Sequence, residues 1–309
     1  PTVKSTVQAI WAIYVGYTLV GIALLWFAGE PLWRAINHAM AAISTGGFTI
    51  TDDGIANAPA TVKLAYVPIM LVGAISFLVH YRMVVQRVRF NALWQLLEVR
   101  VFVYVLVFGS LILWGHRWLE TGDADPVGSL VLWVSAMTAS GVASVDLTTV
   151  DRASLLLLLV GLAMGGMAGS AAGGIKLLRV GLLFKDVIGQ LRRLRATPHE
   201  VVVLRYNGAR ITPAEMATLG HTALRLIGVF FLLWLAGVFL LLYWMPEDMR
   251  LAYIFFDTAS AIFNNGLGTG VAGSDLDSGS ALVLSLLMLL GRLEVFPLLL
   301  LAAFFLGRR

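Results

Sequence analysis

Small polar residues and glycine stand together at three places where an apolar segment ends. The three runs are Ser44-Thr45-Gly46-Gly47, Ala139-Ser140-Gly141 and Asn264-Asn265-Gly266. Glycine permits unusual backbone dihedrals, which let successive carbonyl oxygens face one point. Rings of backbone carbonyls can replace the hydration shell of potassium. The residue types therefore indicate a cation site built from main-chain oxygen atoms.

The three runs and the residues beside them supply the predicted ion-binding positions. These are Ser44, Thr45, Gly46, Gly47, Ser140, Gly141, Val142, Asn264, Asn265, Gly266 and Leu267. A single run of this kind also occurs in turns of soluble proteins. Its recurrence at equivalent places favours a common function.

Each run follows a short apolar segment that begins near a proline, and each is followed by an acidic loop. The segments start at Pro31, Pro126 and Pro246. Thirteen helical residues cover only about 20 Å, too little to cross a bilayer. A short helix that enters from outside directs its negative C-terminal end toward the membrane centre. An anion would require the opposite end, so the arrangement favours a cation.

The remainder of the chain has the composition of a membrane protein. It is 59% apolar and 13% charged, against roughly a half and a quarter in soluble domains. Long apolar runs predict spans at 7–28, 60–79, 99–119, 153–180, 217–244 and 279–306. The short segments lie between these spans. We therefore predict an all-α transmembrane fold of repeated units, each a span, a re-entrant pore loop and a span, around a central pore.

The repeats divide the chain into four regions. Residues 1–98 and 99–190 are predicted to form one unit each, 191–215 a cytoplasmic connection, and 216–309 the last unit. Basic residues concentrate in the 80–100 and 176–215 loops, which the positive-inside rule assigns to the cytoplasm. The acidic loops then lie outside, where they attract cations. The net charge of +4 follows this topology and does not indicate nucleic-acid binding.

Catalysis has little support in the sequence. The chain contains no cysteine, which excludes thiolate chemistry and disulfides. No nucleophile stands with a base, and no His, Asp and Glu residues have metal-site spacing. His38 is interpreted as a packed or interfacial histidine. Asp257 is open to two interpretations, a charge that attracts cations and a hydrogen-bonded support for the pore loop.

A glycine-rich stretch interrupts the predicted span at 153–180. It contains Gly165, Gly166, Gly169, Gly173 and Gly174, with Ser170 among them. Each glycine costs a helix interior about 1 kcal/mol relative to alanine. Small residues at four-residue spacing allow close packing of transmembrane helices. The alternative is an unwound loop that blocks the pore and can move, and the residues alone leave both possibilities open.

Four stretches of the sequence resemble the Trk/Ktr/HKT superfamily of cation transporters, and most closely its bacterial TrkH-type potassium uptake subunits. They are ISTGGFT (43–49), GGMAGSAAGGIKLLR (165–179), FNNGLGTGV (263–271) and LLGRLEVFPLLLL (289–301). The resemblance implies four pore units in one chain, with one filter glycine each, matched here by Gly46, Gly141 and Gly266. It also implies an intramembrane gating loop at 165–174.

The resemblance carries expectations about partners and location as well. It implies a multi-pass protein of the bacterial cytoplasmic membrane, in contact with lipid and assembled as a homodimer. A cytosolic nucleotide-binding (RCK-type) regulatory subunit is expected, and the regulatory nucleotide would bind there. No cofactor is expected in this chain, and potassium is the expected substrate.

The sequence departs from the family pattern in the number of units. Only three are present, which correspond to the second, third and fourth. We expect the first to be missing from this chain, since Pro1 resembles an arbitrary start; the alternative is that another chain supplies it. Glycine in all four units accompanies potassium selectivity in the family, whereas serine in the first accompanies sodium permeation. The three units leave that choice open.

Arg292 lies in the last predicted span at the depth of the glycine-rich stretch, about 20 Å from the outer end by helical rise. A buried arginine in a membrane requires partners. Carbonyls freed by unwinding are suitable acceptors for its five donors. We predict that Arg292 holds the loop closed. The alternative is that its side chain extends to an interface.

These features predict potassium uptake through a gated, cation-selective pore. Broken helices also form the midplane ion sites of alternating-access symporters, which is the alternative function. A scaffold without ion flux is a third possibility.

Overall fold

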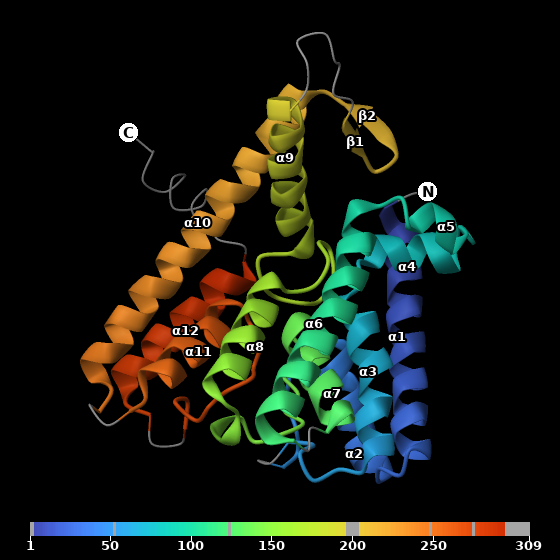
Figure 1. Ribbon diagram of the computed structural model, residues 1–309. Helices are drawn as coiled ribbons and strands as arrows, with labels where there is room; N and C mark the ends of the chain where they lie inside the picture. The colour runs from blue at the N-terminus through green and yellow to red at the C-terminus, as the bar shows by residue number, and fades with distance from the viewer. Residues whose placement is uncertain are drawn as a thin grey trace, which may run out of the picture.

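Three groups of helices with the same order recur along the described part of the chain. The computed structural model describes residues 3–51, 54–122, 125–195, 204–246, 249–273 and 276–293. Each unit has a long helix, a short helix and a further helix (Figure 1). The units are α1 (Val3–Phe27), α2 (Leu32–Ile43) and α3 (Ala60–Ala74); α6 (Leu97–Thr121), α7 (Pro126–Met137) and α8 (Arg152–Met164); and α10 (Pro213–Trp244), α11 (Leu251–Ile262) and α12 (Ser278–Arg292).

The three short helices have the same length. Each of α2, α7 and α11 contains 12 residues, or about 18 Å of helix. The first begins directly after Pro31 and the second at Pro126, as expected. The prediction that the third begins at Pro246 is wrong. Met249 N–H donates to the Pro246 carbonyl in a separate turn, and α11 begins only after Arg250.

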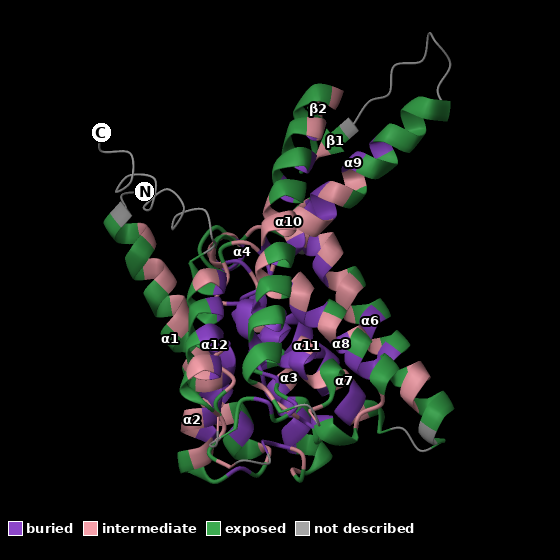
Figure 2. Ribbon diagram, turned by 90° about the vertical axis from the view of Figure 1, so that its left-hand side faces the viewer, coloured by how far each residue is buried: buried purple, intermediate pink, exposed green. Residues whose placement is uncertain are grey.

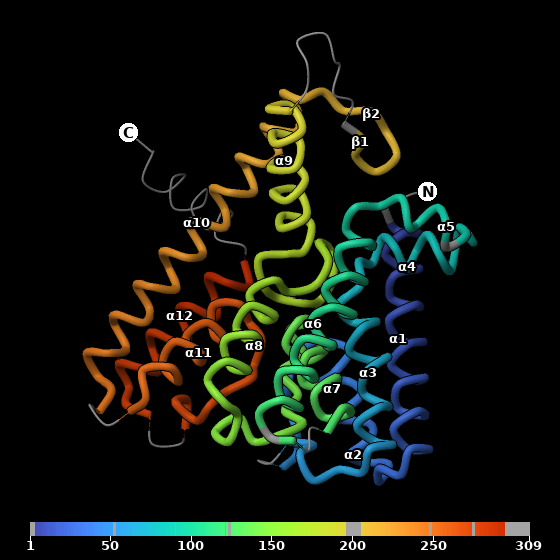
Figure 3. Tube along the Cα trace, viewed as in Figure 1, coloured from blue at the N-terminus to red at the C-terminus, as the bar shows by residue number. Residues whose placement is uncertain are grey.

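Two predicted spans are interrupted. The span at 60–79 ends at Ala74, because Ile75 and Ser76 are extended, and α4 (Phe77–Val84) continues at an angle of 99°. The continuous span predicted at 153–180 is wrong. Its helix α8 ends at Gly165, where φ is 68° and ψ is −169°, a conformation open to glycine. The chain stays unwound to Lys176 and then forms α9 (Leu177–Arg195), as Figure 3 shows.

A β-hairpin joins α9 to α10 within the connection predicted at 191–215. Strands β1 (Leu204–Tyr206) and β2 (Ala209–Ile211) pair antiparallel. Asn207 and Gly208 form the turn with φ of 49° and 84°, the two positive angles that a type I′ hairpin requires. The turn is tied to the start of α6 in the second unit, since Leu97 N–H donates to Asn207 Oδ1 at 2.9 Å. Short elements complete the fold: α5 (Phe90–Leu93) and the 3₁₀ turn η1 (Leu147–Thr149).

The long helices lie outside, α7 and α11 lie in the core, and α2 lies at the edge with one face exposed (Figure 2). Nearly every residue of α7 from Gly128 to Met137 is buried. Helices α1 and α10 instead expose large apolar side chains, such as Trp11 (65% exposed) and Phe239 (75% exposed). Within the described residues, α1, α6 and α10 are long and apolar enough to cross a membrane, and the bent pair α3–α4 could form a fourth span. An apolar exterior of this extent suits a lipid environment.

Candidate functional site: the meeting point of three short helices

The three short helices end in one and the same backbone conformation. Thr45, Ala139 and Asn264 are left-handed, with φ of 55°, 54° and 51°. The next amide in each unit donates back across the last helical turn, at 2.8 to 3.0 Å. These features define a helix-terminating Schellman motif. A glycine with positive φ then follows in each unit, at positions 47, 141 and 266.

These three glycines meet at one point. A methyl group on Gly141 would lie 2.4 Å from the carbonyl oxygen of Asn265, 3.0 Å from Gly266 Cα and 3.1 Å from Gly47 Cα. A methyl group on Gly47 would lie 2.9 Å from the carbonyl oxygen of Ser140. The main chains of Gly47 and Gly266, which lie more than 200 positions apart in the sequence, therefore approach each other closely. Only glycine allows this close approach.

The register of the first unit differs from the sequence expectation. Gly46 was matched to Gly141 and Gly266, but the left-handed residue and the returning amide bond show that Gly47 is their equivalent. Gly46 is instead the equivalent of Ser140 and Asn265, whose amides make the same returning bond. Because Gly46 and Gly47 are adjacent, the sequence alone does not show which of the two is equivalent to Gly141 and Gly266.

The other predicted ion-site residues hold the meeting point together. Val142 and Leu267 are 1% exposed, so their side chains are packed in the core and only their main chain is available. Asn265 Nδ2 donates to the Ala136 carbonyl at 2.7 Å, which joins the second and third units. Asn264 Nδ2 donates to the Met288 carbonyl at 3.0 Å. Ser44 Oγ donates to the carbonyl of Ala41 in its own helix.

A cavity of about 610 Å³ adjoins the meeting point. Its lining includes residues 44–48 of the first unit, residues 264–268 of the third, and the Arg292 side chain. A second cavity of about 220 Å³ is lined by residues 169–174 and again by Arg292. Arg292 thus borders both spaces, and the unwound stretch borders the smaller one.

The unwound stretch at 165–176 is fixed by main-chain hydrogen bonds to the bend between α3 and α4. Met167 N–H donates to the Ala74 carbonyl at 2.9 Å, and Phe77 N–H donates to the Gly169 carbonyl at 3.0 Å. The bend thus supplies partners for groups that unwinding leaves unpaired. Of the two interpretations of the glycines, the broken helix is the one observed. Small residues still matter for contact, because a methyl group on Gly173 would lie 2.1 Å from the Phe263 carbonyl oxygen.

The carbonyl oxygen of Ala171, in the glycine-rich stretch, accepts hydrogen bonds from two other regions of the chain. It accepts from Arg292 Nη1 at 2.9 Å and from Thr45 Oγ1 at 2.9 Å. Arg292 is the last residue of α12, and Thr45 belongs to the first pore loop. Lys176 Nζ donates to the neighbouring carbonyl of Ala172. The predicted latch residue therefore contacts the glycine-rich stretch, and so does Thr45, one of the residues predicted to bind the ion.

Glu98 is a contact of the loop that the sequence analysis missed. Its carboxylate accepts from Ala168 N–H within the glycine-rich stretch. The only signal in the sequence was an acidic residue at the edge of a predicted span. Asp257, which was open to two interpretations, makes the hydrogen bonds expected of a support for its loop. Its carboxylate accepts from Thr269 N–H at 2.6 Å and Val271 N–H at 2.9 Å.

Comparison with known proteins identifies the family. A family model described as TrkH, cation transport protein, matches residues 1–116 and 124–307. The chain belongs to the TrkH family of cation transport proteins. This assignment confirms the resemblance to the Trk/Ktr/HKT superfamily and places the chain among membrane transporters.

Individual TrkH-family proteins align over most of this chain. An uncharacterized cation transporter of Methanocaldococcus jannaschii is 28% identical, covering 98% of this chain and 60% of the relative. The potassium uptake protein TrkH of Salmonella typhimurium is 27% identical, covering 97% and 62%. The crystal structure of the potassium transporter TrkH from Vibrio parahaemolyticus matches with a TM-score of 0.84 at 26% identity, covering 97% and 64%. The all-α transmembrane fold is confirmed, and the chain spans 60–64% of these relatives' length.

Proposed function

We propose that the chain forms three pore units of a gated, potassium-selective uptake protein. The observation that carries the proposal is the meeting of Gly47, Gly141 and Gly266 at the ends of three 12-residue helices. Each helix directs its negative C-terminal end toward this point. The main chain beyond each helix end supplies the carbonyl oxygens that replace water around potassium. Similarity to proteins named as potassium transporters supports the choice of ion.

The units of the proposed pore are residues 1–98, 99–190 and 216–309, equivalent to the second, third and fourth of the family, with 191–215 as a cytoplasmic connection. In Figure 1, α4, α5, the hairpin and the far end of α9 lie at one end of the molecule. The basic residues in these elements favour the cytoplasm for that end. We assign the protein to the bacterial cytoplasmic membrane on this basis.

The unwound stretch is the proposed gate, with Gly165, Gly166, Gly169, Ser170, Gly173 and Gly174 as its flexible positions. Arg292 would hold it closed through the Ala171 carbonyl, and its positive charge would repel cations from the path. We further propose a homodimer regulated by a cytosolic nucleotide-binding (RCK-type) subunit. Potassium is the substrate in this scheme, and the regulatory nucleotide binds to the partner.

Substitution of Gly141 tests the proposal. Gly141→Ser should reduce discrimination of potassium over sodium by about tenfold, a free-energy change of roughly 1.4 kcal/mol, because any side chain there meets the main chain of two other units. Rubidium uptake into proteoliposomes, with sodium as competitor, measures this ratio. Gly115→Ala is the matched control, since a methyl group there meets no atom within 4 Å. An unchanged ratio in Gly141→Ser would refute the ion-site assignment.

A current recording separates the pore from the alternating-access carrier. Unitary current steps at fixed voltage are expected for the pore. Flux limited by turnover, without steps, would favour the carrier instead.

A further inference from the structure

The common register of the short helices makes positions in the three units directly comparable. Counting back five residues from the last helical residue gives His38 in α2, Leu132 in α7 and Asp257 in α11. Counting forward three residues from the converging glycines gives Ile50, Ser144 and Thr269. The first set lies within the short helices, and the second lies in the loops that leave the meeting point.

Two units make the same hydrogen bond between these positions. Ile50 N–H donates to His38 Nε2 at 3.2 Å, and Thr269 N–H donates to Asp257 Oδ1 at 2.6 Å. In both units, therefore, a side chain of the short helix accepts from the same amide of the loop that follows it. His38 is 1% exposed and Asp257 is 5% exposed. Thr269 is 4% exposed, so its amide would be left unpaired without this acceptor, which is costly, whereas Ile50 is 46% exposed.

The middle unit lacks this acceptor and uses another bond. Leu132 has no polar atom, and Ser144 Oγ donates to the Gly128 carbonyl of the same short helix at 2.8 Å. All three loops are thus bound back to their own short helices. A titratable side chain accepts the bond only in the first and third units.

The protonation of His38 is defined by its neighbours. Because Nε2 accepts from Ile50, the imidazole proton is on Nδ1, which faces the Glu30 carboxylate at 3.1 Å and the Tyr66 hydroxyl at 2.5 Å. A proton added at Nε2 would place two donors, Nε2–H and Ile50 N–H, against each other. The Glu30 carboxylate would meanwhile stabilise the imidazolium. Binding of a proton and retention of the Ile50 bond therefore exclude each other.

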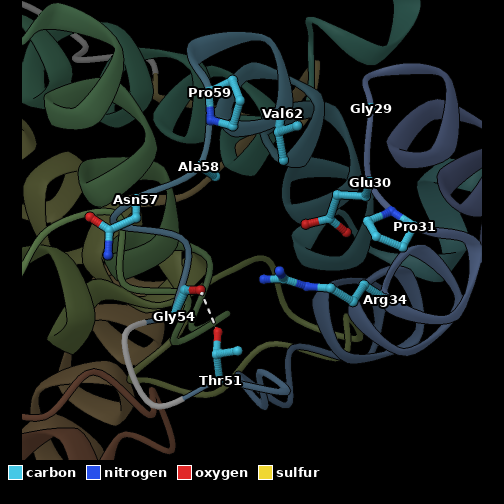
Figure 4. A pocket seen from close by; sticks show the side chains of 10 residues that line it. All are labelled: Gly29, Glu30, Pro31, Arg34, Thr51, Gly54, Asn57, Ala58, Pro59 and Val62. Atoms are coloured by element: carbon cyan, nitrogen blue, oxygen red, sulfur yellow. Dashed lines mark hydrogen bonds between the residues drawn. The ribbon is translucent and has the colours of Figure 1, made fainter.

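Among the described residues, the helices α1, α2 and α3 carry few charged groups besides His38. On α2, Arg34 lines a pocket of about 220 Å³ together with Glu30, and Figure 4 shows both side chains directed into it. On α3, Lys63 Nζ lies 4.0 Å from Asp125. Helix α1 has its only charge at Lys4, near its opposite end. Asp52 and Asp53 follow Ile50 in the chain and lie outside the described residues. The pocket gives protons access to Glu30.

We infer that His38 and Asp257 are positioning residues for ion selectivity, and that His38 makes the first pore loop sensitive to external pH. The inference rests on the proposed function. Neutral His38 holds the Ile50 amide and with it the loop that leaves Gly47. Protonated His38 releases that amide, so the carbonyls of the first unit lose their fixed position.

Two variants of His38 separate the acceptor from the proton. Glutamine can present an oxygen where Nε2 lies and does not titrate, whereas leucine offers no acceptor. Wild-type protein should lose potassium over sodium discrimination about fivefold between external pH 8 and 5.5, the ratio expected for one neutral hydrogen bond. His38→Gln should keep the pH 8 ratio throughout, and His38→Leu should show the low ratio at both pH values. Leu132→Met, at the equivalent position without an acceptor, should behave as wild type.

A second measurement does not depend on transport. Amide hydrogen exchange of the peptide around Ile50, corrected for the intrinsic effect of pH, should accelerate at pH 5.5 in wild type but not in His38→Gln. Size-exclusion elution in detergent verifies that each variant is folded. The same pH response in wild type and His38→Gln would overturn the inference, whether seen in exchange or in flux. Protein without any rubidium flux would overturn the proposed function, while exchange would still decide the role of His38.

Discussion

At the scale of single residues, Thr45, Ala139 and Asn264 bear the unfavourable backbone conformation of the site. Non-glycine residues rarely adopt positive φ, and a β-branched threonine is the least suited to it. The sequence predicted a break at each of these places, since glycine follows shortly after. It did not predict which residue turns left-handed, because that depends on the hydrogen bonds that end each short helix. The assignment of Gly46 instead of Gly47 was wrong for this reason.

The predicted role of Arg292, to hold the loop closed, depends on its hydrogen bond to the Ala171 carbonyl. Arg292→Ala removes the donor to the Ala171 carbonyl and a positive charge from the proposed path. Ion flux should therefore increase severalfold at unchanged expression, measured as rubidium uptake. Arg292→Lys keeps the charge but not the forked geometry of arginine, so it should give an intermediate flux. Lower flux from folded Arg292→Ala protein would contradict the role.

Thr45 provides a test of coupling between the proposed ion site and the proposed gate. Its hydroxyl donates to the same Ala171 carbonyl as Arg292. Thr45→Val keeps the shape of the side chain and removes the donor. Because the two donors share one acceptor, the effects of Thr45→Val and Arg292→Ala on flux should be non-additive in a double-mutant cycle. Additive effects would show that the two residues act independently.

At the scale of elements, the short helices were predictable and the bends were not. Proline, a short apolar segment and a small polar end locate α2 and α7 from the sequence alone. The break after Ala74 has no proline at its position; Ile75 and Ser76 are extended there, and the flanking Ala74 and Phe77 are hydrogen-bonded to another unit. Such a break depends on tertiary hydrogen bonds, which local sequence does not contain. The late start of α11 likewise reflects a separate turn at Pro246.

Deletion of the unwound stretch tests whether this element has the proposed gating role. Deletion of residues 166–172 should raise basal rubidium flux, because it removes the main chain that lines the smaller cavity and that Arg292 holds through the Ala171 carbonyl. It also removes bonds to the α3–α4 bend, so the folded fraction is measured in parallel by size-exclusion chromatography in detergent. Aggregated protein would indicate that the stretch is needed for packing. Folded protein with unchanged flux would exclude a gating role.

At the scale of the whole molecule, α9 carries the surface proposed for a cytosolic partner. Its last turn contains Arg192, Arg193 and Arg195, all exposed. Neutralising the three together, as Arg→Gln, should reduce co-purification of a nucleotide-binding regulatory subunit. Replacement by lysine keeps the charge and should retain the partner if charge alone is recognised. Unchanged co-purification of the glutamine variant would leave these residues as markers of topology only.

The hairpin turn and the unwound stretch are hydrogen-bonded to adjacent residues of α6. Asn207 Oδ1 accepts from the amide of Leu97, and the carboxylate of Glu98 accepts from the amide of Ala168. Only one peptide unit separates the two attachments. The first two residues of α6 are therefore a direct mechanical link between the hairpin and the unwound stretch. A partner that displaced the hairpin would thus transmit force to Ala168 without reshaping any transmembrane helix along its length.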